Sequence, residues 1–214
     1  MTHFTYANIQ KAFDLSDEVF EGLRTYHSLL IKWQKAINIV SKKTLDDAWH
    51  RHFADSAQIA RLIPVDDDKR IYTDLGCGGG FPGLVVAMMR PDLEVHLVES
   101  DERKGQFMRT VMREVGISNA TVHARRIEDM TDIFVPDYVS ARALASLARL
   151  LDYCHAWVVV NPDVRFYFLK GRQVEDEIAD ARAVYDFELT AHSSVTDEQA
   201  QIIALDRVIS SLRA

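Results

Sequence analysis

The feature of this sequence that most restricts its fold is a glycine-rich segment at residues 74–83, which reads D-L-G-C-G-G-G-F-P-G. The apolar run Ile71–Leu75 leads into it and has the residue types of a β-strand. A helix is predicted to start at Pro82, because proline is well tolerated in a first helical turn. Glycine allows a sharp turn and lets a ligand approach the backbone without meeting a β-carbon. Since ligands of open α/β sheets bind outside the carboxyl ends of the strands, the segment predicts a nucleotide-like cofactor site.

From Arg70 onward, short β-rich runs alternate with helical stretches. This alternation predicts a parallel sheet covered by helices on both faces, the doubly wound α/β class, with two final strands joined by a short loop. The expected strands are Ile71–Leu75, Glu94–Val98, Thr121–Ala124, Tyr138–Ala141, Phe166–Leu169, Phe187–Ala191 and Gln201–Val208. The expected later helices are Glu102–Val115, which Gly116 should end, Ser146–Val159 and Val174–Tyr185.

The first part of the chain has a different pattern. Apolar residues recur at the three-to-four spacing of a helix between Val19 and Trp33. Thr44 stands three residues before Asp47, a variant of the capping box, and is expected to open a second helix that runs through Leu62. We therefore predict an N-terminal helical cap at residues 1–65 and a main domain at residues 66–214.

The charge balance does not suggest a nucleic-acid binder. The formal net charge is −7 and the sequence pI is about 5.6, whereas such proteins are more often basic. Net charge averages over all faces, however, so a basic surface has to be sought locally. Arg126, Arg142 and Lys170 are expected at or near strand ends, where they could form a positive rim for phosphates.

Further expectations come from patterns that the sequence lacks. Cys77 and Cys154 have the spacing of neither a disulfide framework nor a zinc site. His50 and His52 would point to different faces of a helix, so no metal ion is predicted. There is no signal pattern and no apolar stretch long enough to span a bilayer. We expect a cytoplasmic protein without a membrane partner, and a monomer.

Two cofactors are compatible with the glycine pattern. The spacing G-x-G-x-x-G at residues 78–83 matches the dinucleotide fingerprint, and Glu99 could hold a ribose hydroxyl pair, so an NAD-dependent oxidoreductase stays an alternative. Asp74, however, closes the strand where a carboxylate would face the cationic end of S-adenosylmethionine but would repel a pyrophosphate. Pro82 also displaces the phosphate-binding helix start. We therefore favour S-adenosylmethionine, with Asp74, Gly78 and Glu99 as cofactor-binding residues.

Several strings, taken in order, resemble the bacterial ribosomal RNA small subunit methyltransferase G family, also called glucose-inhibited division protein B. Besides the glycine-rich segment, they are R-H-F-A-D-S at residues 51–56, E-S-D-E-R-K at 99–104, S-A-R-A at 140–143 and L-K-G at 169–171. The resemblance implies a seven-stranded class I S-adenosylmethionine-dependent methyltransferase fold of the Rossmann-like type. It also implies methylation of N(7) of a guanine in 16S ribosomal RNA.

The resemblance further implies roles for individual residues. It places cofactor contacts at Gly76, Phe81, Ile127, Glu128 and Arg142, and basic positions near cofactor or RNA at Lys104, Arg126, Lys170 and Arg207. Arg142, which is also expected at a strand end, is the candidate for a catalytic positioning role. His52 and Asp55 are three residues apart, and we expect them to make a structural hydrogen-bond link between the cap and the main domain.

Guanine N(7) carries a lone pair and no proton, so its methylation needs alignment and exclusion of water rather than a general base. The lack of an evident His–Asp or Cys–His pair is compatible with this reaction. Two other classes stay open: a small-molecule methyltransferase, which the acidic pI slightly favours, and a non-catalytic RNA- or nucleotide-binding module. A basic surface around the cofactor mouth would favour an RNA partner, either 16S ribosomal RNA or the small ribosomal subunit.

Overall fold

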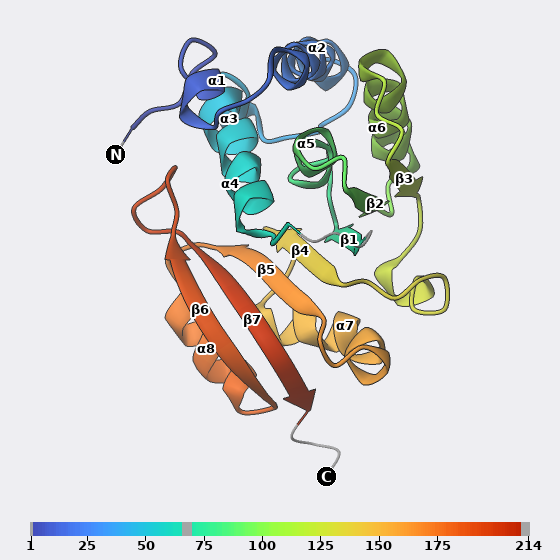
Figure 1. Cartoon of the computed structure of the whole chain (residues 1–214), viewed down its shortest axis with the longest axis vertical. Helices are drawn as coiled ribbons and strands as arrows, with labels where there is room; N and C mark the ends of the chain where they lie inside the picture. The colour runs from blue at the N-terminus through green and yellow to red at the C-terminus, as the bar shows by residue number, and fades with distance from the viewer. Residues whose placement is uncertain (1, 66–69, 211–214) are drawn as a thin grey trace.

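The strands form one seven-stranded sheet in the computed structural model, which describes residues 2–65 and 70–210 (Figure 1). Their order across the sheet is β3-β2-β1-β4-β5-β7-β6. Strands β1 to β5 are parallel to one another, and β7 runs antiparallel to both β5 and β6. Their bounds are β1 (Arg70–Leu75), β2 (Leu93–Val98), β3 (Ala120–His123), β4 (Tyr138–Arg142), β5 (Arg165–Lys170), β6 (Tyr185–Ser193) and β7 (Gln201–Ser210).

Helices cover both faces of the sheet, as Figure 1 shows. On one face, α5 (Gly83–Met89) and α6 (Glu102–Val115) share an apolar core with the N-terminal helices. On the other face, α7 (Leu147–Val160) and α8 (Val174–Arg182) bury a second core. None of the helices in the described part of the chain is both long and apolar enough to cross a membrane. The remaining helices are α1 (Ile9–Ala12), α2 (Asp17–Gln34), α3 (Lys42–Leu45), η1 (Trp49–Ala54), α4 (Asp55–Leu62) and η2 (Ile127–Asp129).

The structure confirms the doubly wound class and the predicted order of strands and helices after residue 70. Helix α6 has the predicted bounds and ends at Gly116, whose φ of 83° makes a left-handed cap. The two predicted final strands are β6 and β7, which pair antiparallel. The boundaries of the strands and of α7 differ from the prediction by one or two residues. Helix α5 begins at Gly83 with Pro82 as its N-cap, and α8 ends at Arg182, so that Tyr185 belongs to β6.

The start predicted for the second cap helix is wrong. Thr44 lies inside α3, a separate short helix, and the chain then forms the π-helix η1 before α4 begins at Asp55. The hydroxyl of Thr44 is bonded to the carbonyl of Ser41 and to the ring of His52, so it does not cap a helix that continues to Leu62. The segment that carries His52 is therefore η1.

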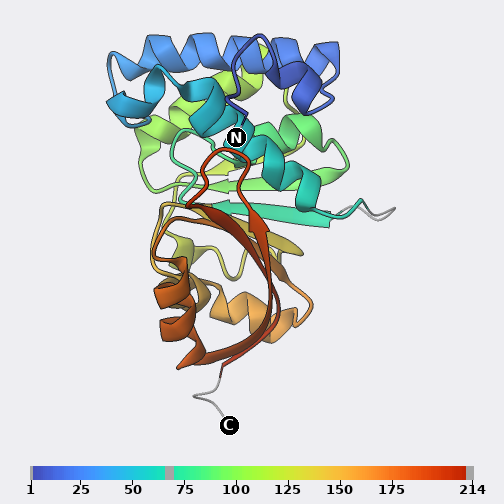
Figure 2. The same ribbon diagram turned by 90° about the vertical axis from the view of Figure 1, so that its left-hand side faces the viewer.

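The cap packs directly on the glycine-rich loop. Tyr26 of α2 donates a hydrogen bond to the carbonyl of Gly79, and its ring stacks on Phe81 with centroids 4.8 Å apart. Phe53 meets the same ring edge to face at 5.2 Å. Figure 2 shows the loop between β6 and β7 reaching toward the cap helices. The predicted boundary after residue 65 adjoins residues 66–69, which lie outside the described residues.

Candidate active site

Asp74 holds the glycine-rich loop at the end of β1. Its carboxylate accepts hydrogen bonds from the Gly83 N–H at 2.7 Å and from the Ser140 hydroxyl at 2.9 Å. The side chain is fully buried, and burial raises the pKa of this carboxyl group to about 7. We predicted that Asp74 would face the cofactor. The structure instead turns it beneath the loop, because the N–H at the start of α5 needs an acceptor, and Asp74 lines neither cavity described below.

The first cavity has a volume of about 340 Å³ and lies beyond the ends of β1 and β2. We call it the cofactor cleft because most of the residues predicted to bind the cofactor line it. The nearly buried Glu99 follows β2, and its carboxylate accepts hydrogen bonds from the N–H groups of Gly78 and Asp101, both at 2.9 Å. A carboxylate has about four lone-pair positions, so Glu99 retains capacity to accept from hydroxyl groups. The cleft is lined by Gly76, Gly78, Val98, Glu99, Ser100, Lys104, Arg125, Arg126, Ile127, Glu128, Ala143, Leu144 and Tyr153.

Two loop glycines that line the cofactor cleft have a left-handed backbone conformation. Gly78 has a φ of 56°, and a β-carbon there would meet no atom within 4 Å. Gly76 has a φ of 60°, and a β-carbon there would come within 2.5 Å of Leu144. The structure therefore brings the predicted cofactor residues Gly76, Gly78, Glu99, Ile127 and Glu128 together around one cleft.

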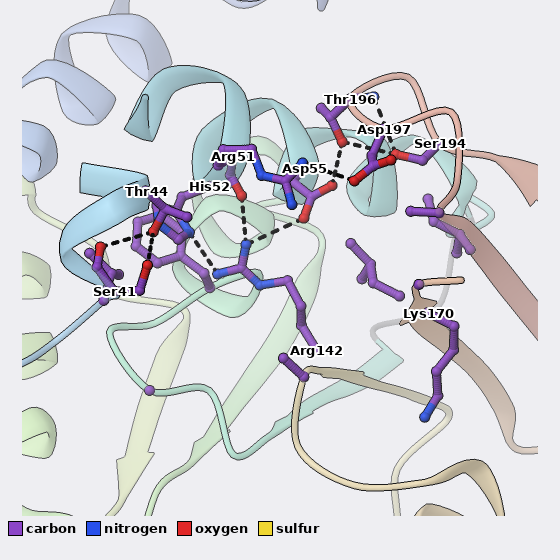
Figure 3. Close-up of a pocket in the computed structure, with 18 of the residues that line it drawn as sticks. Ser41, Thr44, Arg51, His52, Asp55, Arg142, Lys170, Ser194, Thr196 and Asp197 are labelled. Carbon is purple, nitrogen blue, oxygen red and sulfur yellow. Dashed lines mark hydrogen bonds and ion pairs between the residues drawn. The ribbon is translucent and has the colours of Figure 1, made fainter. Parts of the chain in front are cut away.

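The second cavity, the cap-side cavity, has a volume of about 500 Å³ and lies between the cap, the glycine-rich loop and the ends of β4, β5 and β7 (Figure 3). It shares Gly76, Gly78 and Ala143 with the cofactor cleft, so the two cavities meet at the loop. Its other lining residues come from five separate parts of the chain. They are Ile39, Val40, Ser41, Thr44, Arg51, His52, Asp55, Cys77, Gly79, Phe81, Arg142, Ala145, Leu169, Lys170, Gly171, Glu177, Ser194, Thr196, Asp197, Ala200, Gln201 and Ile202.

Arg142, the last residue of β4, directs its guanidinium group into the cap (Figure 3). The group donates to the carbonyl of Arg51 at 2.8 Å, to the carboxylate of Asp55 at 3.3 Å and to Nδ1 of His52 at 3.0 Å. It also lies over the ring of Phe81, 5.6 Å from the centroid. The predicted link between cap and main domain is present, and it runs through Arg142 rather than directly between His52 and Asp55.

The ring of His52 is held in one protonation state by its surroundings. Burial and the neighbouring Arg142 and Arg51 lower the pKa of His52 to about 3, so the ring is neutral. Because Nδ1 accepts from Arg142, the proton resides on Nε2, which donates to the Thr44 hydroxyl at 2.9 Å. The ring also stacks on Phe81, with centroids 5.1 Å apart. Both ring nitrogens of His52 are therefore engaged.

A second set of contacts, which sequence reasoning missed, ties the cap to the loop between β6 and β7 (Figure 3). Asp55 uses its other oxygen to accept from the Thr196 hydroxyl at 2.7 Å, and Arg51 pairs with Asp197 at 3.2 Å. Thr196 is 141 residues from Asp55, and no local pattern signals a contact over that separation. The sequence signal for these contacts is on the cap side alone, in the R-H-F-A-D-S string at residues 51–56.

Comparison with known proteins gives this arrangement its context. The family model described as rRNA small subunit methyltransferase G matches residues 20–205. The chain belongs to this family. A protein named ribosomal RNA small subunit methyltransferase G from Rhodospirillum centenum is 43% identical over 96% of this chain and 92% of its own length. A protein of the same name from Rhizobium leguminosarum is 41% identical over 91% of this chain and 95% of its own length.

Solved structures agree with this membership at the level of the fold. A S-adenosylmethionine-dependent O-methyltransferase from Thermotoga maritima aligns with a TM-score of 0.57 at 16% identity, covering 90% of this chain and 72% of its own. A S-adenosylmethionine-dependent methyltransferase from Aquifex aeolicus aligns with the same TM-score of 0.57 at 13% identity, covering 76% and 95%. The predicted class I methyltransferase fold is confirmed, and the NAD-dependent oxidoreductase is set aside. Membership of the methyltransferase G family implies S-adenosylmethionine as the cofactor.

The predicted RNA-contacting residues of this methyltransferase G chain lie in three different settings. Lys104 and Arg126 line the cofactor cleft. Lys170 is buried in the wall of the cap-side cavity, where its amine bonds to the Ala145 carbonyl at 2.7 Å and to Glu177 at 2.6 Å. Arg207 pairs with Glu188 on the exposed part of β7. Because β7 is antiparallel to β5, Arg207 lies at the opposite end of the sheet from the cavities, so it does not join the site.

The structure also brings together His3, Asp47 and His50 in the cap, a group that the sequence analysis did not predict. His3 Nε2 lies 3.0 Å from Asp47, and two histidines with a carboxylate are a common metal-binding set. The Phe4 N–H, however, donates to Nδ1 of His50, so Nδ1 acts as an acceptor and the ring hydrogen lies on Nε2. A metal-binding histidine has the reverse arrangement, with its second ring nitrogen acting as a donor. We therefore assign no metal site here.

Proposed function

We propose that this protein transfers a methyl group from S-adenosylmethionine to N(7) of a guanine in 16S ribosomal RNA. Family membership supports the substrate class, since the relatives are named ribosomal RNA small subunit methyltransferases. The choice of N(7) follows from the resemblance noted in the sequence.

The observation that best supports the proposal is that the cofactor cleft and the cap-side cavity meet at Gly76 and Gly78. Methyl transfer needs two ligands held next to each other and aligned, with water excluded between them. We assign the cofactor to the cleft, with Glu99 holding the ribose hydroxyls and Ile127 and Glu128 beside the adenine. The acceptor is assigned to the cap-side cavity.

The proposed reaction requires no proton acceptor from the protein. S-adenosylmethionine supplies an electrophilic methyl on a cationic sulfur, and as the N(7) lone pair forms the N–C bond, the electron pair of the broken C–S bond stays on sulfur. The positive charge passes to the guanine ring, and no proton moves. The neutral His52, with both nitrogens engaged, supports a reaction without a general base. Arg142 and Phe81 are assigned to positioning at the border between the two cavities.

Positive charge at the cleft supports RNA over a small-molecule acceptor. Lys104, Arg125 and Arg126 line the cofactor cleft, and both arginines are exposed. Phosphate contacts fix the register of a nucleic acid on a protein, and Arg and Lys side chains are common donors for them. We assign Lys104 and Arg126 to contacts with the RNA backbone.

The test is transfer of labelled methyl from S-adenosylmethionine to 16S RNA, free and within small subunits, both taken from cells that lack this protein. We expect label at one guanine, with chain cleavage there after borohydride and aniline treatment, which identifies methylation at N(7). Label at another atom would contradict the N(7) assignment. Cofactor binding without label on either form of RNA would point to a small-molecule acceptor.

A further inference from the structure

The end of α2 and the segment that follows it are strongly basic. Residues 22–45 contain no aspartate or glutamate, although the chain has 32 acidic residues. Four lysines lie in the second half of this stretch, and we call residues 32–43 the lysine arm. Its lysines are Lys32, Lys35, Lys42 and Lys43. The acidic balance of the whole chain therefore does not extend to this part of the cap.

The four lysines of the arm are free to bind a partner. Each of them is exposed, and none makes an ion pair with any residue that the structure describes. Most arginines in the described part of the chain are paired with acids, as Arg109 is with Glu102 and Arg113 with Glu114. The charges of those arginines are largely neutralised by their neighbours, whereas the charges of the lysine arm add to one another.

The lysine arm is held in one place beside the glycine-rich loop. The side-chain oxygen of Gln34 accepts hydrogen bonds from the backbone N–H groups of Ile39 and Val40 at 2.9 and 3.0 Å. The side-chain nitrogen of Gln34 donates to the carbonyl of Val40 at 2.8 Å. Ile39 is buried and packs on Gly79 so closely that a β-carbon at Gly79 would clash with it. Gln34 thus closes the turn within the arm, and Ile39 anchors the arm to the glycine-rich loop.

The lysine arm also borders the cap-side cavity. Ser41 and Thr44 line this cavity, as Figure 3 shows, and Lys42 and Lys43 stand between them in the chain. On the other side of the glycine-rich loop, the cofactor cleft carries the basic residues that we assigned to the RNA backbone. Positive charge therefore occurs on both sides of the place where the two cavities meet.

We propose that the lysine arm binds phosphates of the RNA on the cap side of the acceptor guanine, so that the RNA backbone is held on both sides of this base. This inference rests on the proposed function and gives the cap a share of the RNA-binding surface. Lysine is a common donor to phosphate oxygens, and such contacts fix the register of a nucleic acid without reading its sequence. The arm places the guanine at the cap-side cavity and takes no part in the transfer of the methyl group.

The first test variant is Lys42→Gln/Lys43→Gln, which removes two charges of the arm. Its matched control is Lys11→Gln/Arg113→Gln, which removes two charges from exposed positions that line neither cavity. Lys42→Arg/Lys43→Arg keeps both charges of the arm and tests whether charge alone is required. The second test variant, Lys32→Gln/Lys35→Gln, removes the other two charges of the arm.

The experiment measures the binding of each protein to 16S RNA over a range of salt concentrations. Each phosphate contact releases counterions, so the logarithm of the binding constant falls with the logarithm of the salt concentration by about 0.7–0.9 per contact. We expect each glutamine variant to reduce this slope by about 1.5 and to weaken RNA binding about tenfold at low salt. The control and the arginine variant should keep the slope of the wild type.

Methyl transfer, the dissociation constant for S-adenosylmethionine and the melting temperature are measured for the same proteins. Both glutamine variants should raise the KM for RNA and leave kcat and cofactor affinity unchanged. A merely structural role of the lysines would lower the melting temperature and leave the salt slope as it is.

A wild-type slope in either glutamine variant, or an equal loss of slope in the control, overturns the inference. The expected slopes without methyl transfer by the wild type would contradict the proposed function and leave the lysine arm as an RNA-binding surface. The two results are therefore distinguishable.

Discussion

The cofactor cleft and the cap-side cavity meet at one loop, but the chain builds them in different ways. The cleft is formed by segments that follow parallel strands, so the strand order alone brings its residues together. The cap-side cavity is closed by contacts between distant segments: Arg142 lies 87 residues from Asp55, which lies 141 residues from Thr196. The cleft is thus a property of the fold class, whereas the cavity depends on how this cap and this hairpin meet the sheet.

This difference predicts that variants will separate into two groups. Substitutions in the cleft should change cofactor affinity, and substitutions in the cap-side contacts should change the use of the acceptor. Arg142 lies at the border and contacts both the cap and Phe81, so its removal should disturb both.

Arg142→Ala is expected to have the largest effect, a fall in methyl transfer of about 100-fold, since small misplacements of reacting groups have consequences of this order. The substitution removes three hydrogen bonds to the cap and leaves the largely buried carboxylate of Asp55 without its cation. Labelled methyl transfer at saturating cofactor and RNA measures the loss. Arg149→Ala, at an exposed position of α7, is the control, and an equal activity of the two variants would contradict the role of Arg142.

Glu99→Ala should come next, with a rise of about 30-fold in the dissociation constant for S-adenosylmethionine, because hydrogen bonds to a charged acceptor contribute about 1.5–3 kcal/mol. The KM for RNA should stay the same. Calorimetry measures the affinity, and Glu102→Ala on the exposed start of α6 is the control. An unchanged cofactor affinity together with a raised KM for RNA would show that Glu99 contributes to binding of the RNA rather than of the cofactor.

The sequence was sufficient to predict that the residues of the cofactor cleft lie together, because they follow strand ends. Gly76, Gly78 and Glu99 follow β1 and β2, and the position of such residues depends on local pattern alone. Local pattern does not predict the direction of a side chain, as Asp74 shows. Its place at the end of β1 was predicted correctly, but the direction of its side chain depends on which backbone N–H needs an acceptor, and no pattern shows that.

The cap-side cavity could be predicted on its cap, loop, β4 and β5 sides, but not on the side of the final hairpin. The R-H-F-A-D-S string and Arg142 were recognised, but Thr196 and Gln201 join them only after the final hairpin folds back on the sheet. The position of Arg207, away from both cavities, was not predicted for a related reason. A short string does not reveal that its strand is antiparallel, and reversal of the strand puts this residue at the far end of the sheet.

Asp55→Asn tests the cap side in isolation, because it keeps the shape of the side chain and removes its charge. We expect kcat/KM for RNA to fall about tenfold, while the cofactor dissociation constant changes by less than about twofold. Asp46→Asn, an exposed carboxylate in the cap, is the matched control. A rise in the cofactor dissociation constant comparable to that of Glu99→Ala would show that the cap also holds the cofactor, and the two regions would not be separate.

The smallest expected effect is on the pH dependence of the free energy of unfolding, to which His52 and Asp74 contribute with opposite signs. Burial and Arg142 lower the pKa of His52 from 6.5 to about 3, so the unfolded chain binds this proton more readily. The contribution of the His52 pKa shift to the free energy of unfolding is therefore fully present above about pH 6.5, and it is lost as the pH falls. Burial raises the pKa of Asp74 from 3.8 to about 7, so the folded chain binds that proton more readily. The contribution of the Asp74 pKa shift to the free energy of unfolding is therefore fully present below about pH 3.8, and it is lost as the pH rises through about pH 7.

Urea unfolding of variants at about pH 8 and about pH 6 separates these two contributions. Over this fall in pH, the wild type should lose about 1 kcal/mol of unfolding free energy relative to His52→Gln and gain about 1 kcal/mol relative to Asp74→Asn. A constant difference from His52→Gln would mean that the ring takes up its proton normally in the folded protein. A protonated ring cannot accept the hydrogen bond from Arg142, so the link that joins the cap to β4 would have to be a different one. The pH profile therefore tests, without any substrate, whether a neutral histidine joins the cap to β4 and whether the carboxyl group beneath the glycine-rich loop has a raised pKa.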